Sequence, residues 1–112
     1  LYENLKIENI IYATGIHRLR IVPVGYAKDR AVEYFNSRRM HQFIREIKSR
    51  YQDRFIVIDT PSASNSIEAR VLSQYCDASV LVVPSGQVVT DQIMAGIDAL
   101  GKDKFAGLIF NN

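Results

Sequence analysis

The stretch FIVIDTPS, residues 55–62, places four consecutive apolar residues directly before Asp59. A continuous apolar run that ends in turn residues is typical of a strand covered on both faces, as in parallel sheets. Open α/β sheets bind their ligands at the carboxyl ends of the strands, so an acid there is a candidate binding residue. We therefore expect a strand over 55–58 and a functional role for Asp59, with a simple loop cap as the alternative.

Apolar runs and helical patterns alternate on both sides of this stretch. Residues 19–24 predict a strand, and residues 31–51 predict an amphipathic helix whose main part is capped by Ser37. Residues 5–13 fit either a short helix or an irregular strand. The downstream elements are a helix opened by an Asn65–Glu68 capping box and extending to Tyr75, a strand over 78–83, a helix capped by Thr90, and a strand over 105–110. This alternation predicts an α/β fold with a parallel sheet flanked by helices.

Composition limits the class of protein. The 112 residues are 47% hydrophobic and 23% charged, which favours a single globular domain over 1–112. The longest apolar runs are too short for a membrane span, and no secretory leader is recognisable. Cys76 is the single cysteine, so the sequence offers no internal disulfide and no paired-cysteine metal site. We expect a cytoplasmic protein.

Charge is distributed unevenly, although the net charge is only +2. Residues 1–54 contain eleven Lys/Arg and six Asp/Glu, whereas residues 55–112 contain three and six. This mildly basic first half falls short of a nucleic-acid-binding signature, so no nucleic acid is expected as a partner. The cations of the predicted helix 31–51 fit a solvated face or, alternatively, a contact with anionic lipid headgroups.

Two chemical roles are possible for an aspartate in the position of Asp59. A receiver domain uses an aspartate at such a strand end as phosphoryl acceptor, but it also needs an acidic pair at its first strand. Residues 9–25 contain no Asp or Glu, which argues against this reading. In P-loop ATPases, an apolar strand that ends in Asp is the Walker B element, which orients Mg²⁺.

Five segments resemble, in order, motifs of the bacterial tyrosine autokinases that regulate polysaccharide chain length, within the P-loop partitioning-ATPase superfamily. FIVIDTPS (55–62) resembles their hydrophobic strand followed by Asp-x-Pro. The other four segments are TGIHRLRIVPVG (14–25), NSRRMHQFIREIKSRY (36–51), VLVVPSGQVVTDQI (80–93) and GLIFNN (107–112). The resemblance covers almost the whole chain. It implies a partial P-loop NTPase domain that acts in exopolysaccharide or capsule biosynthesis and export.

The chain also departs from that family. The 112 residues contain no G-x-x-x-x-G-K-[ST] loop to cradle phosphates and no Asp-x-Asp motif at a strand end, and Ser62 replaces a frequent second proline. The chain starts at Leu1 rather than at methionine. From the resemblance we expect both missing motifs before Leu1 and a tyrosine-rich tail after Asn112. The chain would then be the C-terminal part of the kinase domain, unable to transfer phosphate alone.

The resemblance implies ATP and Mg²⁺ as cofactors of the complete domain. Asp59 would hold Mg²⁺ and help to activate a tyrosine hydroxyl, whereas Thr60 and Pro61 would shape the turn beside the γ-phosphate. Asn111 would lie near the adenine, with a cap just after the last strand as an equal alternative. Implied partners are further copies of the chain, a membrane-anchored polysaccharide chain-length or export protein, and the inner face of the cytoplasmic membrane.

Two other functions fit the same residues. A non-catalytic interaction module of the polysaccharide export machinery would keep the sheet without a phosphate-binding loop. A partitioning-type positioning ATPase would share the element around Asp59 but would lack a tyrosine-rich tail.

Overall fold

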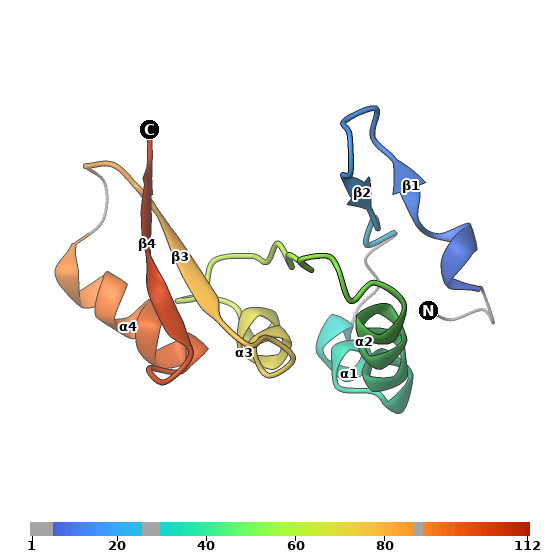
Figure 1. Ribbon diagram of the computed structural model, residues 1–112. Coiled ribbons are helices and arrows are strands. Elements are labelled where there is room, and N and C mark those ends of the chain that lie inside the picture. Colours follow the sequence, from blue (N-terminus) through green and yellow to red (C-terminus); the bar gives the residue numbers. More distant parts are fainter. Residues whose placement is uncertain (1–5, 26–29, 87–88) are drawn as a thin grey trace. The chain divides into compact units, whose positions relative to one another are not determined.

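The computed structural model describes residues 6–25, 30–86 and 89–112. The chain divides into two compact units, residues 1–56 and 57–112, and Figure 1 shows the elements of each. The expectation of one domain over 1–112 stays a prediction. Among the helices that are described, none combines the length and the apolar character that a membrane crossing requires.

The first unit begins with a short 3-10 helix and a small hairpin. Its elements are η1 (Ile7–Asn9), β1 (Tyr12–Ala13), β2 (Arg20–Ile21), α1 (Ala31–Phe35) and α2 (Arg38–Arg50). β1 and β2 are antiparallel, so the strand expected over 19–24 is shorter than predicted and belongs to a hairpin. The turn between them explains this pairing, because the Thr14 hydroxyl donates to the Leu19 carbonyl at 3.1 Å and accepts from the Ile16 N–H.

The helix expected over 31–51 is present as two helices that meet at Ser37. Its side chain accepts a hydrogen bond from the Met40 N–H at 3.2 Å, which confirms the predicted cap. From there α2 buries Met40, Ile44 and Ile47, spaced four and three residues apart. Together with Ile7 of η1, these residues form the buried apolar core described in this unit.

The second unit carries the parallel sheet. Its elements are α3 (Ile67–Ser73), β3 (Ser79–Pro84), α4 (Thr90–Leu100) and β4 (Phe105–Asn111). β3 and β4 run side by side in the same direction, with Val82 opposite Ile109 and Pro84 opposite Asn111. Two strands joined through a helix in this way are the elementary α/β unit, and α4 contacts both β3 and α3 (Figure 1). The α/β expectation is confirmed at this level.

Close approach of α4 to β3 depends on Gly96. A Cβ atom at this position would lie 3.2 Å and 3.3 Å from the two Leu81 methyl carbons. The small residue therefore lets the helix lie directly on the sheet. Val83 of β3 and, on α3, Ala69 and Leu72 are also buried in this unit.

Residues 55–58 are not a strand, so that prediction is wrong. The segment has no strand partner in the described residues, and two of its side chains are almost fully exposed, Phe55 at 100% and Val57 at 87%. An apolar run forms a strand only when a neighbouring strand accepts its backbone hydrogen bonds. The sequence pattern identified the β propensity of this segment but not the presence of a partner.

Two predicted helix caps are displaced by one residue. Ser66 rather than Asn65 caps α3: its hydroxyl accepts from the Ala69 N–H and donates to Glu68 at 2.7 Å. The cap of α4 is Val89, which makes no side-chain hydrogen bond, and Thr90 is already helical. Each segment offers two adjacent positions for the first turn, and backbone geometry selects between them.

Candidate functional site

Asp59 lies directly after the extended apolar segment, with an exposed side chain. In the described part of the chain, this carboxylate has no hydrogen-bond or ion-pair partner. An unpaired, solvated carboxylate is free to bind a cation, and Mg²⁺ often takes only one or two protein carboxylates together with water and phosphate oxygens. Asp59 is therefore chemically suited to the role predicted for it.

The residues after Asp59 form a tight loop. The Thr60 hydroxyl donates to the Pro61 carbonyl at 3.1 Å, and the Ser62 and Ser64 hydroxyls lie 3.1 Å apart. Ala63, only 8% exposed, anchors this loop in its unit. A local hydrogen bond between Thr60 and Pro61 thus holds this turn, and the predicted role of the two residues beside a γ-phosphate stays a prediction.

Asn111 lies at the carboxyl end of the sheet. It is the last residue of β4, stands opposite Pro84, and accepts the Ser85 N–H at its backbone carbonyl at 3.0 Å. The carboxyl ends of β3 and β4 therefore meet here, at the edge where open α/β sheets bind ligands. The exposed Asn111 side chain is available to a ligand at this edge.

Ser85 is a neighbour of this edge that sequence reasoning did not select. The signal was present, because Pro84-Ser85-Gly86 directly follows a buried strand, and turn residues at a strand end are candidate ligand contacts. The structure brings Ser85 and Asn111 together. No hydrogen bond or ion pair in the described residues joins Asp59 to Asn111.

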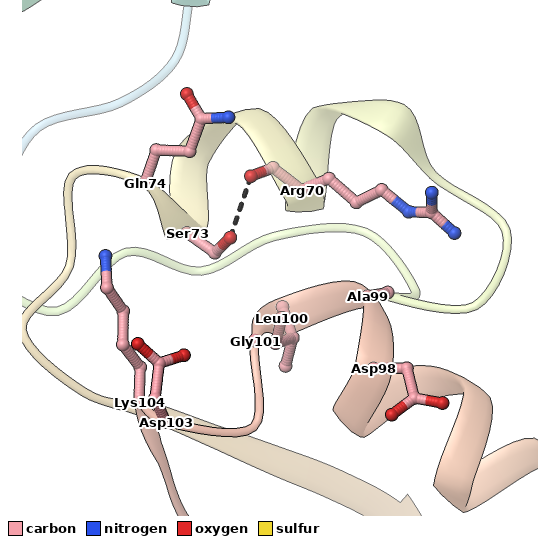
Figure 2. A pocket seen from close by; sticks show the side chains of 9 residues that line it. All are labelled: Arg70, Ser73, Gln74, Asp98, Ala99, Leu100, Gly101, Asp103 and Lys104. Carbon is pink, nitrogen blue, oxygen red and sulfur yellow. Dashed lines mark hydrogen bonds between the residues drawn. The ribbon is translucent and has the colours of Figure 1, made fainter.

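A separate depression of about 350 Å³ lies at the other end of the sheet (Figure 2). Figure 2 shows Arg70 from α3, Gln74 directly after α3, Asp98 from α4, and Asp103 and Lys104 from the turn that leads into β4. The lining thus combines both signs of charge. Because this turn precedes β4, the depression lies at the amino ends of the strands and is distinct from the predicted site.

Two features that a Mg²⁺-nucleotide site needs are lacking. The described residues contain no group of three or more His, Cys, Asp or Glu side chains that would hold a metal. The sequence also lacks a glycine-rich loop whose backbone N–H groups would cradle phosphates. Asp59 thus has the chemistry of a single Mg²⁺ ligand, and no phosphate-binding loop accompanies it in the 112 residues.

Comparison with known proteins shows a consistent set of relatives. The chain is 26% identical over 110 residues to the tyrosine-protein kinase CpsD of Streptococcus agalactiae, covering 96% of the chain and 47% of the relative. It is 29% identical over 101 residues to CpsD of Streptococcus pneumoniae, covering 88% and 43%. It is 26% identical over 113 residues to the tyrosine-protein kinase YwqD of Bacillus subtilis, covering 99% and 47%.

The chain is similar to bacterial tyrosine-protein kinases. This finding confirms the resemblance drawn from the five sequence segments. The chain spans less than half of the length of these relatives. No protein-family model matches it, and no solved structure gives a significant match.

Proposed function

We propose that this chain forms part of an ATP-dependent protein-tyrosine autokinase that regulates exopolysaccharide or capsule biosynthesis. The observation that carries the proposal is the similarity to three tyrosine-protein kinases over 88–99% of the chain. In the proposed protein, this chain is the C-terminal part of a partitioning-type P-loop nucleotide domain. Its location is the inner face of the cytoplasmic membrane, beside a membrane-anchored polysaccharide chain-length or export protein.

Within that domain, Asp59 is proposed to hold Mg²⁺ through water. Its exposed, unpaired carboxylate and its position after an apolar segment support this role. When bound, ATP and Mg²⁺ would supply the phosphoryl group and neutralise its charge. Thr60 and Pro61 keep the adjoining loop compact, and Asn111 offers an amide at the carboxyl edge of the sheet.

A second candidate is a non-catalytic interaction module of the polysaccharide export machinery. It is favoured by one observation, which is the lack of a phosphate-binding loop in the 112 residues. In this reading, the chain would dock on the export proteins or complete a nucleotide site on a partner.

Tyrosine phosphorylation of the complete gene product with Mg²⁺-ATP distinguishes these candidates. We expect phosphotyrosine in the wild type, a loss of about 10- to 100-fold in Asp59→Asn, and little change in the matched control Asp98→Asn. Asp98 is a suitable control because it lies on α4 towards the amino ends of the strands, where it pairs with Lys102 at 3.3 Å. A complete protein that binds its partners but never acquires phosphotyrosine would contradict the kinase proposal and favour the module.

A further inference from the structure

The turn that follows β3 is tied to the end of β4 by a backbone hydrogen bond. Pro84, the last residue of β3, lies opposite Asn111 and has no N–H to donate. The next residue, Ser85, donates its N–H to the Asn111 carbonyl at 3.0 Å. Gly86 then has a φ of +76°, a left-handed conformation that suits glycine and lets the chain turn away from the sheet. The bond therefore joins the two strand ends at the carboxyl edge of the sheet.

Asn111 is held through its backbone rather than through its side chain. The side chain is exposed, and so is that of the preceding Phe110, at 66%. In the part of the chain that the structure describes, the Asn111 amide makes no hydrogen bond. An amide that recognises a ligand must be held in a fixed position by its surroundings. For Asn111, the bond from Ser85 supplies such a constraint at the residue itself.

A fixed asparagine amide distinguishes purines that differ at position 6. Adenine presents an amino donor at N6 next to an acceptor at N7, and one asparagine amide pairs with both through its carbonyl and its NH₂ group. Hypoxanthine, the base of ITP, carries an oxygen at position 6 and therefore presents two acceptors. The amide carbonyl would then face an oxygen and lose its hydrogen bond. This discrimination is lost when the amide is free to turn.

We propose that the Ser85 N–H is a positioning group for the contact between Asn111 and an adenine base. The inference rests on the function proposed above, in which Asn111 lies near the adenine of bound ATP. Ser85 acts through Asn111, because removal of its N–H releases the end of β4 that carries the amide. Affinity for ATP and preference for ATP over ITP should then fall together. The rate of phosphoryl transfer should change little, since the positioned amide contacts the base.

Ser85→Pro in the complete gene product removes the donor, and the chain offers a matched control. The stretch VPVG (22–25) has the same pattern as VPSG (83–86), with φ of +77° and +76° at the two glycines. Among the described residues, the Val24 N–H makes no hydrogen bond, so Val24→Pro alters an equivalent turn without removing one. Ser85→Ala is the conservative variant, because it keeps the N–H and removes only the hydroxyl.

Circular dichroism verifies that the variants fold. If Ser85→Pro does not fold, Gly86→Ala takes its place, because a side chain at a φ of +76° strains the same turn. Gly86→Ala is expected to act in the same direction.

The measurement is phosphotyrosine formation by the complete gene product, as kcat and KM, with ATP and with ITP. We expect Ser85→Pro to raise KM for ATP about tenfold, to change kcat by less than about twofold, and to reduce the preference for ATP over ITP about tenfold. Ser85→Ala should restore the wild-type values, and Val24→Pro should keep them. In an Asn111→Ala background, Ser85→Pro should add no further loss, because both changes remove the same contact.

Losses that add up in the Ser85→Pro/Asn111→Ala double variant would overturn the proposal, since Ser85 would then act independently of Asn111. An unchanged preference for ATP over ITP in Ser85→Pro would overturn it as well. If Asn111→Ala keeps the wild-type KM and preference, the positioning proposal fails and the kinase proposal stands. A complete wild-type protein that neither binds ATP nor acquires phosphotyrosine contradicts the proposed function itself, and the inference falls with it.

Discussion

At the scale of single residues, Ser37 determines where the second helix of the first unit begins. Its hydroxyl accepts from the Met40 N–H at 3.2 Å and donates to the Tyr34 carbonyl at 2.6 Å, so it joins the end of α1 to the start of α2. We predict that Ser37→Ala lowers the free energy of unfolding by about 1 kcal/mol, because an orphan helix N–H loses its acceptor. Ser49→Ala, on an exposed position within α2, is the control and should leave stability unchanged or slightly raised.

The ion pair between Glu8 and Arg50 makes stability depend on pH. The hydrogen bond from Arg50 lowers the pKa of Glu8 below the ordinary glutamate range. A lowered pKa in the folded state means that the pair stabilises the fold above the ordinary glutamate pKa and that this contribution disappears as pH falls through the lowered value. Denaturant unfolding at pH 7 and pH 3 should show a smaller loss of stability in Glu8→Gln than in the wild type.

The matched control for this pair is Glu33→Gln. Glu33 lies 3.8 Å from Arg30 in a single exposed ion pair within one turn, which contributes little to stability. Its pH dependence should therefore follow the wild type. An unchanged pH dependence in Glu8→Gln would show that the Glu8–Arg50 pair does not contribute to folding.

At the scale of elements, the packing of α4 on β3 is sensitive to side-chain volume at Gly96. Gly96→Val should destabilise the second unit by about 1–3 kcal/mol, because the added carbons would press on the Leu81 methyl groups. Gly107→Val is the control: no atom lies within 4 Å of a Cβ there, and valine suits a strand. Thermal unfolding followed by circular dichroism compares the two. Equal stability of the two variants would contradict the described helix–sheet contact.

Sequence reasoning worked best where structure is determined by nearby residues. The apolar stripe of α2, its Ser37 cap, and the strands β3 and β4 depend on local periodicity or on one hydrogen bond, and all were predicted closely. The strand over 55–58 depends instead on a distant partner. No local pattern reports whether such a partner is available, so an apolar run of high β propensity remains unpaired here.

The residues of the candidate site differ in the same way, because some depend on local structure and others on distant partners. Asn111 follows a strand that does form, so its place at the carboxyl edge could be predicted from order alone. Asp59 follows a segment without a strand partner, and its distance from that edge could not be predicted. Ser85 was recognisable as a strand-end turn residue, but only the parallel register brings it beside Asn111.

At the scale of the whole molecule, we propose one nucleotide domain of which this chain supplies a part. The relatives are tyrosine-protein kinases, and the chain covers 43–47% of their length. The residues described here provide an unpaired carboxylate and a sheet edge, whereas a phosphate cradle is missing from the sequence. Nucleotide binding is therefore expected to require residues beyond the 112.

Calorimetric titration of Mg²⁺-ATP into this chain and into the complete gene product is the most direct measurement. We predict no binding by the 112 residues alone, binding by the complete protein, and an affinity about 10- to 100-fold lower in its Asp59→Asn variant. Asp98→Asn should bind as the wild type does. Failure of the complete protein to bind Mg²⁺-ATP, or full affinity after Asp59→Asn, would contradict the role proposed for Asp59.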